Sequence, residues 1–307
     1  MLVEPNRVFF CQGRGRKYME GTGVPLVTPF DERGDVDESK LADLVEWVET
    51  RGVDFIVPCG SNSEAELMTA EERARVVEIV VESASVPILA GTGHPGLRES
   101  TIQTEMAASV GADAALVVTP FYFSHGQDDI AAYYEKLAGL VSIPVYLYSV
   151  PKFTHVSLDP DTIVGLSDNE NIKGMKDSSG DSDLFRQEVN LTREKDFDML
   201  VGAGGIYAQA LEMGAAGGVL ALANIAPEKC SEIYDLYKKG DKEGAKILND
   251  GLAELNRGVT GTYGISGLKA AMEMRGAPAG FSRSPHRGVG GVEKEALQNL
   301  LEGAGLQ

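Results

Sequence analysis

The sequence has few cysteines, no long apolar run and no secretory signal. Its three cysteines, Cys11, Cys59 and Cys230, are odd in number and far apart, which argues against a disulfide framework and against a zinc cluster. No apolar segment approaches the roughly 20 residues that a membrane-spanning helix needs. These absences predict a protein of a reducing cytoplasm with no membrane partner.

Positive charge is also scarce. Lysine and arginine number 28 against 46 aspartates and glutamates, so the formal net charge is −18. A surface this negative repels nucleic-acid phosphates and anionic lipids, which excludes the common nucleic-acid-binding and membrane-surface roles. We therefore expect small-molecule partners, and the acid excess favours a halophilic, salt-rich cytoplasm.

The first 18 residues differ from the remainder because they are basic. They lead to Met19 and a strong strand pattern, so we expect residues 1–18 to be an N-terminal extension, either disordered or the product of a misassigned translation start. Residues 19–224 and 225–307 then form two further regions.

Residues 19–224 repeat one pattern, in which a short apolar run is followed by a polar turn and an amphipathic stretch. This pattern is typical of βα units, and about eight of them fit the length of a (β/α)8 TIM barrel. A doubly wound sheet would show a glycine-rich nucleotide turn after its first strand, and none is there. The expected strands are 23–30, 53–60, 86–93, 113–120, 143–150, 171–177, 197–202 and 217–223.

After residue 224 the strand patterns stop and helical patterns follow. We expect helices at 227–239, 241–257, 264–275 and near 293–303, with a loop at 276–291. The fold class is therefore α/β, a TIM barrel followed by a C-terminal helical region.

Polar side chains gather where the predicted strands end. In a barrel these ends surround one shared mouth, where the chemistry takes place. The ends carry Thr28, Ser61, Asn62, Thr119, Tyr122, Tyr148, Lys176 and the glycines Gly202 and Gly204 of "GAGG".

Lys176 stands out because it ends an apolar strand, "NIKGMKD". Side chains alternate along a strand, so Lys176 points into the barrel if Met175 packs outward, and Gly174 leaves room for it. Burial among apolar walls disfavours the charged form of an amine, and an unprotonated amine attacks ketones. Schiff-base formation at Lys176 is thus one interpretation, with Tyr148 as proton donor and acceptor and with Ser61 in reach of a small carboxylate. A lysine that only begins a solvated loop is the other.

Four motifs on successive strands carry a family resemblance: "GSNSE" after the second, "TPFYF" after the fourth, "YSVP" after the fifth and "GMKDSSG" on the sixth. Together they resemble the N-acetylneuraminate lyase and dihydrodipicolinate synthase superfamily of class I, pyruvate-dependent aldolases. The match covers residues 20 to about 290.

The resemblance implies an activity and the roles of particular residues. Lys176 would form an imine with pyruvate or another 2-keto acid, with no metal or other cofactor, and Tyr148 would be the catalytic tyrosine. Tyr122 would reach into the site of a neighbouring subunit and relay protons with Ser61. Ser61 and Asn62 would bind the substrate carboxylate, and members are commonly homotetramers built as dimers of dimers.

Departures from the family pattern point to a branch. Dihydrodipicolinate synthases carry an arginine shortly after "VP", where this chain has Phe153, and neuraminate lyases carry acidic residues where this chain has "GAGG". Asn62 replaces the usual threonine. By elimination we expect a lyase that cleaves 2-keto-3-deoxygluconate or its 6-phosphate to pyruvate and an aldehyde, as in the Entner-Doudoroff route of carbohydrate metabolism. Thr28, Gly202 and Gly204 complete the expected substrate site, the glycines through backbone N–H groups.

Other interpretations remain open. Dihydrodipicolinate synthesis from pyruvate and aspartate semialdehyde is the main one. His94, His125 and His155 follow three successive strands and could hold a metal, although their spacing matches no zinc motif. A third interpretation is a non-catalytic sensor that binds a keto acid. Cys59 could also be a nucleophile, although a buried core thiol fits its apolar strand better.

Overall fold

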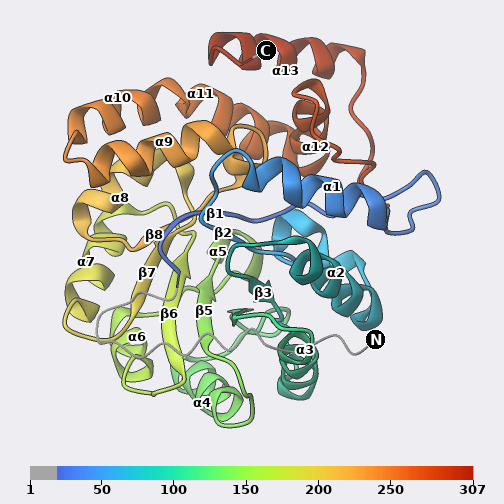
Figure 1. The fold of residues 1–307 in the computed structure, drawn as a ribbon. Coiled ribbons are helices and arrows are strands. Elements are labelled where there is room, and N and C mark those ends of the chain that lie inside the picture. The colour runs from blue at the N-terminus through green and yellow to red at the C-terminus, as the bar shows by residue number, and fades with distance from the viewer. Residues whose placement is uncertain (1–18, 307) are drawn as a thin grey trace, which may run out of the picture.

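The computed structural model describes residues 19–306, and the expected N-terminal extension lies outside them. Eight parallel strands run side by side in the order β2-β1-β8-β7-β6-β5-β4-β3, with helices around them (Figure 1). The strands are β1 Gly21–Val24, β2 Phe55–Ile56, β3 Leu89–Gly91, β4 Ala114–Val118, β5 Val145–Ser149, β6 Ile172–Asp177, β7 Asp198–Val201 and β8 Gly217–Val219. The predicted (β/α)8 barrel is confirmed.

The two edge strands of this order, β2 and β3, meet through a single parallel bridge between Ile56 and Ile88. The N–H of Ile56 donates to the carbonyl of Pro87 at 3.0 Å. The barrel is therefore nearly closed, with its shortest ladder at this seam.

One α-helix follows each strand up to residue 213, except that two α-helices follow β5. They are α1 Glu38–Glu49, α2 Ala70–Ser83, α3 Leu97–Ser109, α4 Gln127–Ala138, α5 Pro151–Thr154, α6 Pro160–Leu166, α7 Ser182–Thr192 and α8 Tyr207–Met213. Asp37 caps α1, and Thr69 forms a capping box with Glu72 at the start of α2, as acidic and hydroxyl residues at these positions predict.

The C-terminal region is helical, as predicted, and its helices gather along one side of the barrel with α13 outermost (Figure 1). They are α9 Pro227–Lys238, α10 Lys242–Gly251, α11 Ala253–Asn256, α12 Gly264–Met274 and α13 Gly291–Gly303. The first of them, α9, packs against α8 and β1, in the place of the helix that follows the eighth barrel strand.

Several boundaries differ from the sequence-based prediction, mostly because the strands are shorter than the apolar runs. β1 begins at Gly21 and ends at Val24, because Pro25 has no N–H to continue the ladder. The second half of the last predicted strand is a 3₁₀ helix, Ala221–Asn224. The predicted helix 241–257 is two helices, and they are followed by a π-helix over Arg257–Tyr263 that the pattern did not predict.

Strand alternation divides the core into two layers. Tyr146 and Tyr148 belong to the cluster inside the barrel, together with side chains such as Phe55 and Leu200. Met175 belongs to the larger cluster between the strands and the helices. The prediction that Met175 packs outward is confirmed, and β6 must therefore direct Lys176 inward.

Candidate active site

Lys176 and Tyr148 lie side by side at the mouth end of neighbouring strands. The two residues are register partners of β6 and β5. The amine Nζ of Lys176 lies 4.3 Å from the centroid of the Tyr148 ring, and each residue is only 6% exposed. A nearly buried amine thus faces the tyrosine that the sequence paired with it, in surroundings that hold little water.

The other lysine of the same strand has a different environment. Lys173 lies on the outer face of β6 and its amine contacts the Asp196 carboxylate at 2.6 Å. The sequence-based separation of the two lysines by strand alternation is confirmed.

Gly202, at the end of β7, makes the space for the Lys176 side chain. A Cβ at Gly202 would lie 3.0 Å from Cε of Lys176 and would collide with the hydroxyl of Ser178. The sequence had given this role to Gly174, which is wrong: a Cβ at Gly174 would meet the ring of Tyr146 and the carbonyl of Asp198 instead. Gly174 therefore makes room for a core tyrosine one layer below.

A cavity of about 320 Å³ opens above Tyr148. Its walls come from the turns after β2, β4 and β5 and from the C-terminal region, so all of these meet at one mouth. The lining residues include Ser61, Glu64, Glu66, Arg73, Phe121, Tyr148, Val150, Phe153, Ile265 and His286. Ser61 and Tyr148 thus share the cavity that a small substrate would enter, and Phe153 forms part of its wall.

The turn that carries Ser61 is held in an unusual backbone conformation. Cys59 and Glu64, on either side of it, have φ angles of 56° and 58°, in the left-handed region that costs free energy for residues other than glycine. The hydroxyl of Ser63 donates to the carbonyl of Leu26. Strain of this kind persists only where surrounding contacts enforce it.

Glu64 provides those contacts from inside the protein. Its side chain is fully buried, and its Oε1 accepts from Nζ of Lys269 at 2.7 Å. Its Oε2 accepts from the backbone N–H of Arg283 and contacts Nδ1 of His286, both at 2.9 Å. Burial lowers the pKa of Lys269 to about 8, and the Glu64 carboxylate opposes that shift. The C-terminal region thus fixes the substrate-side turn through one carboxylate.

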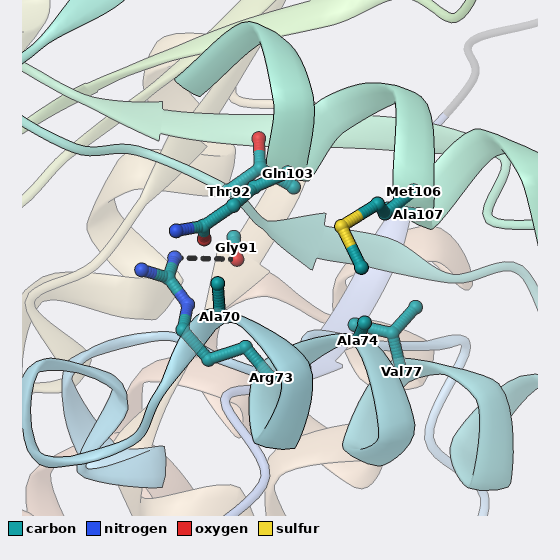
Figure 2. Close-up of a pocket in the computed structure, with 9 residues that line it drawn as sticks. All are labelled: Ala70, Arg73, Ala74, Val77, Gly91, Thr92, Gln103, Met106 and Ala107. Carbon is teal, nitrogen blue, oxygen red and sulfur yellow. Dashed lines mark hydrogen bonds between the residues drawn. The ribbon is translucent and has the colours of Figure 1, made fainter. Parts of the chain in front are cut away.

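Arg73 supports the neighbouring strand end. Figure 2 shows its guanidinium reaching from α2 towards Gly91, with Gln103 and Met106 of α3 across a cavity of about 10 Å³. Nη2 of Arg73 donates to the carbonyls of Gly91 at 3.1 Å and Gly93 at 3.4 Å. These contacts hold the end of β3 against α2, beside the larger cavity.

Sequence reasoning did not select Glu64, Lys269 or His286. Glu64 stands inside the quoted motif "GSNSE", but its partners lie more than 200 residues later. No local pattern connects residues so far apart, so only the fold could reveal this cluster.

Cys59 is not a nucleophile in this structure. The thiol is 3% exposed, burial raises its pKa to about 12, and it donates to the carbonyl of Arg73 at 3.5 Å. The interpretation as a buried core thiol is confirmed.

The remaining predicted residues, and Lys176 itself, are not among the lining residues found in the described part of the chain. Tyr122 is 88% exposed and has a φ of 78°, so its side chain projects from the chain instead of into its own site. Asn62 lies in a short 3₁₀ helix, Ser61–Ser63. Thr28 is buried, and its hydroxyl has no partner among residues 19–306. Gly204 lies beside the Asn256 amide, under the C-terminal helices.

Two buried acids belong to the lysine strand and to the helix after it, Asp177 at the end of β6 and Glu188 in α7. Burial raises the pKa of Asp177, whose carboxylate accepts from the N–H and the hydroxyl of Ser179 and so orients that loop. Glu188 of α7 is 1% exposed, and neither of its carboxyl oxygens has a partner in the described part of the chain. Burial, together with the charges of Asp177 and Asp181, raises the pKa of Glu188 to about 9.

A search of residues 19–306 finds no group of three His, Cys, Asp or Glu side chains that could hold a metal ion. His94, one of the three loop histidines, accepts through Nδ1 from the N–H of Gly96 at 3.0 Å. None of the helices in the same range is long and apolar enough to cross a membrane.

Comparisons with known proteins agree with this geometry. The model of the dihydrodipicolinate synthetase family matches residues 18–304. A DapA-like lyase of Halobacterium salinarum is 37% identical over 290 residues, covering 94% of this chain and 95% of the relative. A 4-hydroxy-tetrahydrodipicolinate synthase of Methanothrix thermoacetophila is 35% identical, covering 92% and 95%.

A solved structure gives the same result at the level of the fold. The chloride-inhibited dihydrodipicolinate synthase of Acinetobacter baumannii, complexed with pyruvate, superposes with a TM-score of 0.90 at 33% identity, over 94% of this chain and 99% of the other. Enzymes of this family act through a Schiff-base lysine and use no metal cofactor. The chain therefore belongs to the dihydrodipicolinate synthetase family and is a carbon–carbon lyase.

Proposed function

We propose that the chain is a class I aldolase that cleaves a 2-keto-3-deoxy sugar acid, 2-keto-3-deoxygluconate or its 6-phosphate, to pyruvate and glyceraldehyde or its 3-phosphate. The observation that carries this proposal is the nearly buried Lys176 amine, which lies 4.3 Å from the ring centroid of Tyr148, a residue that lines the cavity of about 320 Å³. A Val or Ile would pack better in such a place, so packing alone does not explain an amine there.

The proposed chemistry begins with attack of the Lys176 amine on the C2 carbonyl, which loses water and becomes an iminium. The C4 hydroxyl gives its proton to Tyr148 as the C3–C4 bond breaks, and the bonding electrons pass to the iminium nitrogen, giving an enamine. The aldehyde leaves, C3 takes a proton, and hydrolysis of the resulting iminium releases pyruvate and the free amine.

The remaining predicted residues would assist this reaction. Ser61 and Asn62 would bind the substrate carboxylate, and the buried hydroxyl of Thr28 would lie beneath that turn. Tyr122 would act in the site of a neighbouring subunit of a homotetramer, which its exposure in the single chain supports. Gly202 and Gly204 would provide space and backbone N–H groups.

Two observations bear on the choice of branch. Phe153 lines the cavity at the place where dihydrodipicolinate synthases carry an arginine for the second substrate's carboxylate. Among residues 19–306 the lining contains one arginine, Arg73, which is buried and whose Nη2 donates to backbone carbonyls. The described lining thus offers no exposed guanidinium to aspartate semialdehyde, which supports the sugar-acid branch. The second candidate is 4-hydroxy-tetrahydrodipicolinate synthase, which is supported by the names of the relatives.

The acidic composition and the relative from Halobacterium salinarum support a salt-rich cytoplasm as the working environment. Assays should therefore be run in concentrated KCl, because the repulsion among surface carboxylates is screened there.

Trapping the imine tests the central step. Borohydride added with pyruvate should attach a reduced pyruvyl group to Lys176, seen as one modified peptide by mass spectrometry. Lys176→Arg should lose the adduct. Lys173→Arg, on the outer face of the same strand, should keep it. Activity that survives Lys176→Arg and disappears with a chelator would refute the Schiff-base mechanism.

A substrate panel tests the branch. Retro-aldol cleavage of 2-keto-3-deoxygluconate, its 6-phosphate and N-acetylneuraminate should be compared with condensation of pyruvate and aspartate semialdehyde. We expect cleavage of a deoxy sugar acid to give the highest kcat/KM. Turnover in the condensation assay alone would assign the chain to the synthase branch.

A further inference from the structure

His286 is the one histidine that residues 19–306 contribute to the lining of the large cavity, and it comes from the loop between α12 and α13. It shares that lining with Ser61 and Tyr148, which the proposed function places at the substrate. Its side chain is 38% exposed, so it stands at the wall of an open space and not inside the core.

The orientation of the ring follows from its contact with Glu64. A carboxylate only accepts hydrogen bonds, so Nδ1 of His286, 2.9 Å from Oε2 of Glu64, carries the proton between them. In the neutral ring the other nitrogen, Nε2, is then an acceptor. No partner for Nε2 is found within residues 19–306.

Glu64 is itself buried and bonded through both carboxylate oxygens, so the ring has a well-defined support. Lys269 binds one of its oxygens, and the N–H of Arg283 binds the oxygen that His286 also contacts. A side chain held in this way presents its free acceptor in one place, as substrate-positioning residues must.

We propose that His286 determines specificity by accepting, at Nε2, a hydrogen bond from a hydroxyl on the aldehyde half of an unphosphorylated 2-keto-3-deoxy sugar acid. This assignment rests on the proposed function and narrows its substrate.

The charges around the cavity favour an uncharged tail over a phosphate. The charged side chains of the lining are Glu64, Glu66 and Arg73. Arg73 is buried and its Nη2 donates to the carbonyls at the end of β3, and Lys269 already binds Glu64. In the lining formed by residues 19–306, a phosphate would meet the carboxylate of Glu66 and no exposed cation, whereas a hydroxyl finds the Nε2 acceptor.

The test compares a hydroxylated tail with a tail that has none. Wild type and His286→Leu are assayed for cleavage of 2-keto-3-deoxygluconate and of 4-hydroxy-2-oxopentanoate, whose aldehyde half is acetaldehyde. Loss of one hydrogen bond should lower kcat/KM on the sugar acid by about 10-fold to 100-fold. The value for the methyl-tailed substrate should change by about 2-fold or less, and borohydride trapping of pyruvate should be unaffected.

Two controls separate specificity from structure. Arg287→Leu makes the same replacement at the next, exposed position and should leave both substrates unchanged. His286→Gln keeps a polar side chain and should recover part of the sugar-acid activity. Equal losses on both substrates in His286→Leu would mean that the residue only supports the Glu64 turn, and would overturn the assignment.

A wild-type preference for the 6-phosphate over the free sugar acid would also overturn it, while leaving the Schiff-base mechanism intact. Failure of pyruvate trapping in the wild type would instead refute the proposed function, and this assignment with it.

Discussion

Replacing Glu188 by glutamine should remove a pH-dependent loss of stability. The folded protein holds the Glu188 carboxyl in its protonated form up to a pKa of about 9, because the group is buried, has no partner among the residues that the structure describes, and lies near two other acids. In the unfolded chain the same group releases its proton near its ordinary pKa of 4.5. A raised pKa of this kind gives stability that is complete below about pH 4.5 and is lost as the pH rises towards 9.

The size of the effect follows from linkage. Each pH unit between the two pKa values changes the free energy of unfolding by at most about 1.4 kcal/mol. From pH 5 to pH 8 the free energy of unfolding can therefore fall by at most about 4 kcal/mol relative to a protein whose side chain at this position cannot ionise. We expect a fall of at least about 2 kcal/mol. Glutamine has nearly the same shape but remains neutral. Its amide would still lack partners, so Glu188→Gln can be less stable than wild type at pH 5.

The assay is urea unfolding at pH 5, 6, 7 and 8 at one fixed KCl concentration. The expected result concerns the difference in the free energy of unfolding between the two proteins. At every step towards alkaline pH, the free energy of unfolding of Glu188→Gln should rise relative to that of wild type. Asp183→Asn, an exposed acid of the same helix, is the matched control and should run parallel to wild type. Parallel curves for Glu188→Gln as well would mean that Glu188 is ionised and solvated in the folded protein, and would refute the reasoning.

Three further predictions test the site and its support. Gly202→Ala should lower kcat/KM at least about 10-fold, because the new Cβ would collide with the Ser178 hydroxyl. Adding Ser178→Ala should restore part of the activity, and a double variant without any recovery would contradict this explanation. Lys269→Met should lower the free energy of unfolding in urea by about 3–5 kcal/mol, because Glu64 would keep a buried charge without its partner. Adding Glu64→Gln should recover part of that loss, and additive losses would argue against the pairing. Thr69→Ala should cost about 1 kcal/mol by removing the cap of α2, and an unchanged unfolding midpoint would show that the cap contributes nothing.

Local patterns predicted the barrel well where one residue type decides the structure. Asp37 and Thr69 begin their helices as expected, and the strand that ends in Lys176 has its predicted face inside. The patterns failed where an apolar run is buried without being a strand. Residues 25–30 are such a run: the side chains of Leu26, Val27 and Phe30 are buried, but the ladder stops at Val24.

The site was predicted in part, because local patterns show where strands end but not which distant residues meet there. Lys176, Tyr148 and Ser61 come from strand ends, and the barrel topology alone brings strand ends together. The sequence predicted a role for the backbone N–H of Gly202. That Gly202 leaves room for the Lys176 side chain depends on the spacing between β6 and β7, which the sequence does not show. The contact of Glu64 with His286 joins positions 222 apart, which no periodicity encodes.

The buried Glu64 also sets an order of events during synthesis. Its partners Lys269, Arg283 and His286 leave the ribosome after more than 200 further residues have been made. Until then the carboxylate has no counter-charge to offset the cost of its burial, so the turn beside Ser61 lacks the contacts that hold it through Glu64. The barrel strands can pair as they emerge, but the substrate-side turn is completed last, when the end of the chain docks onto its beginning.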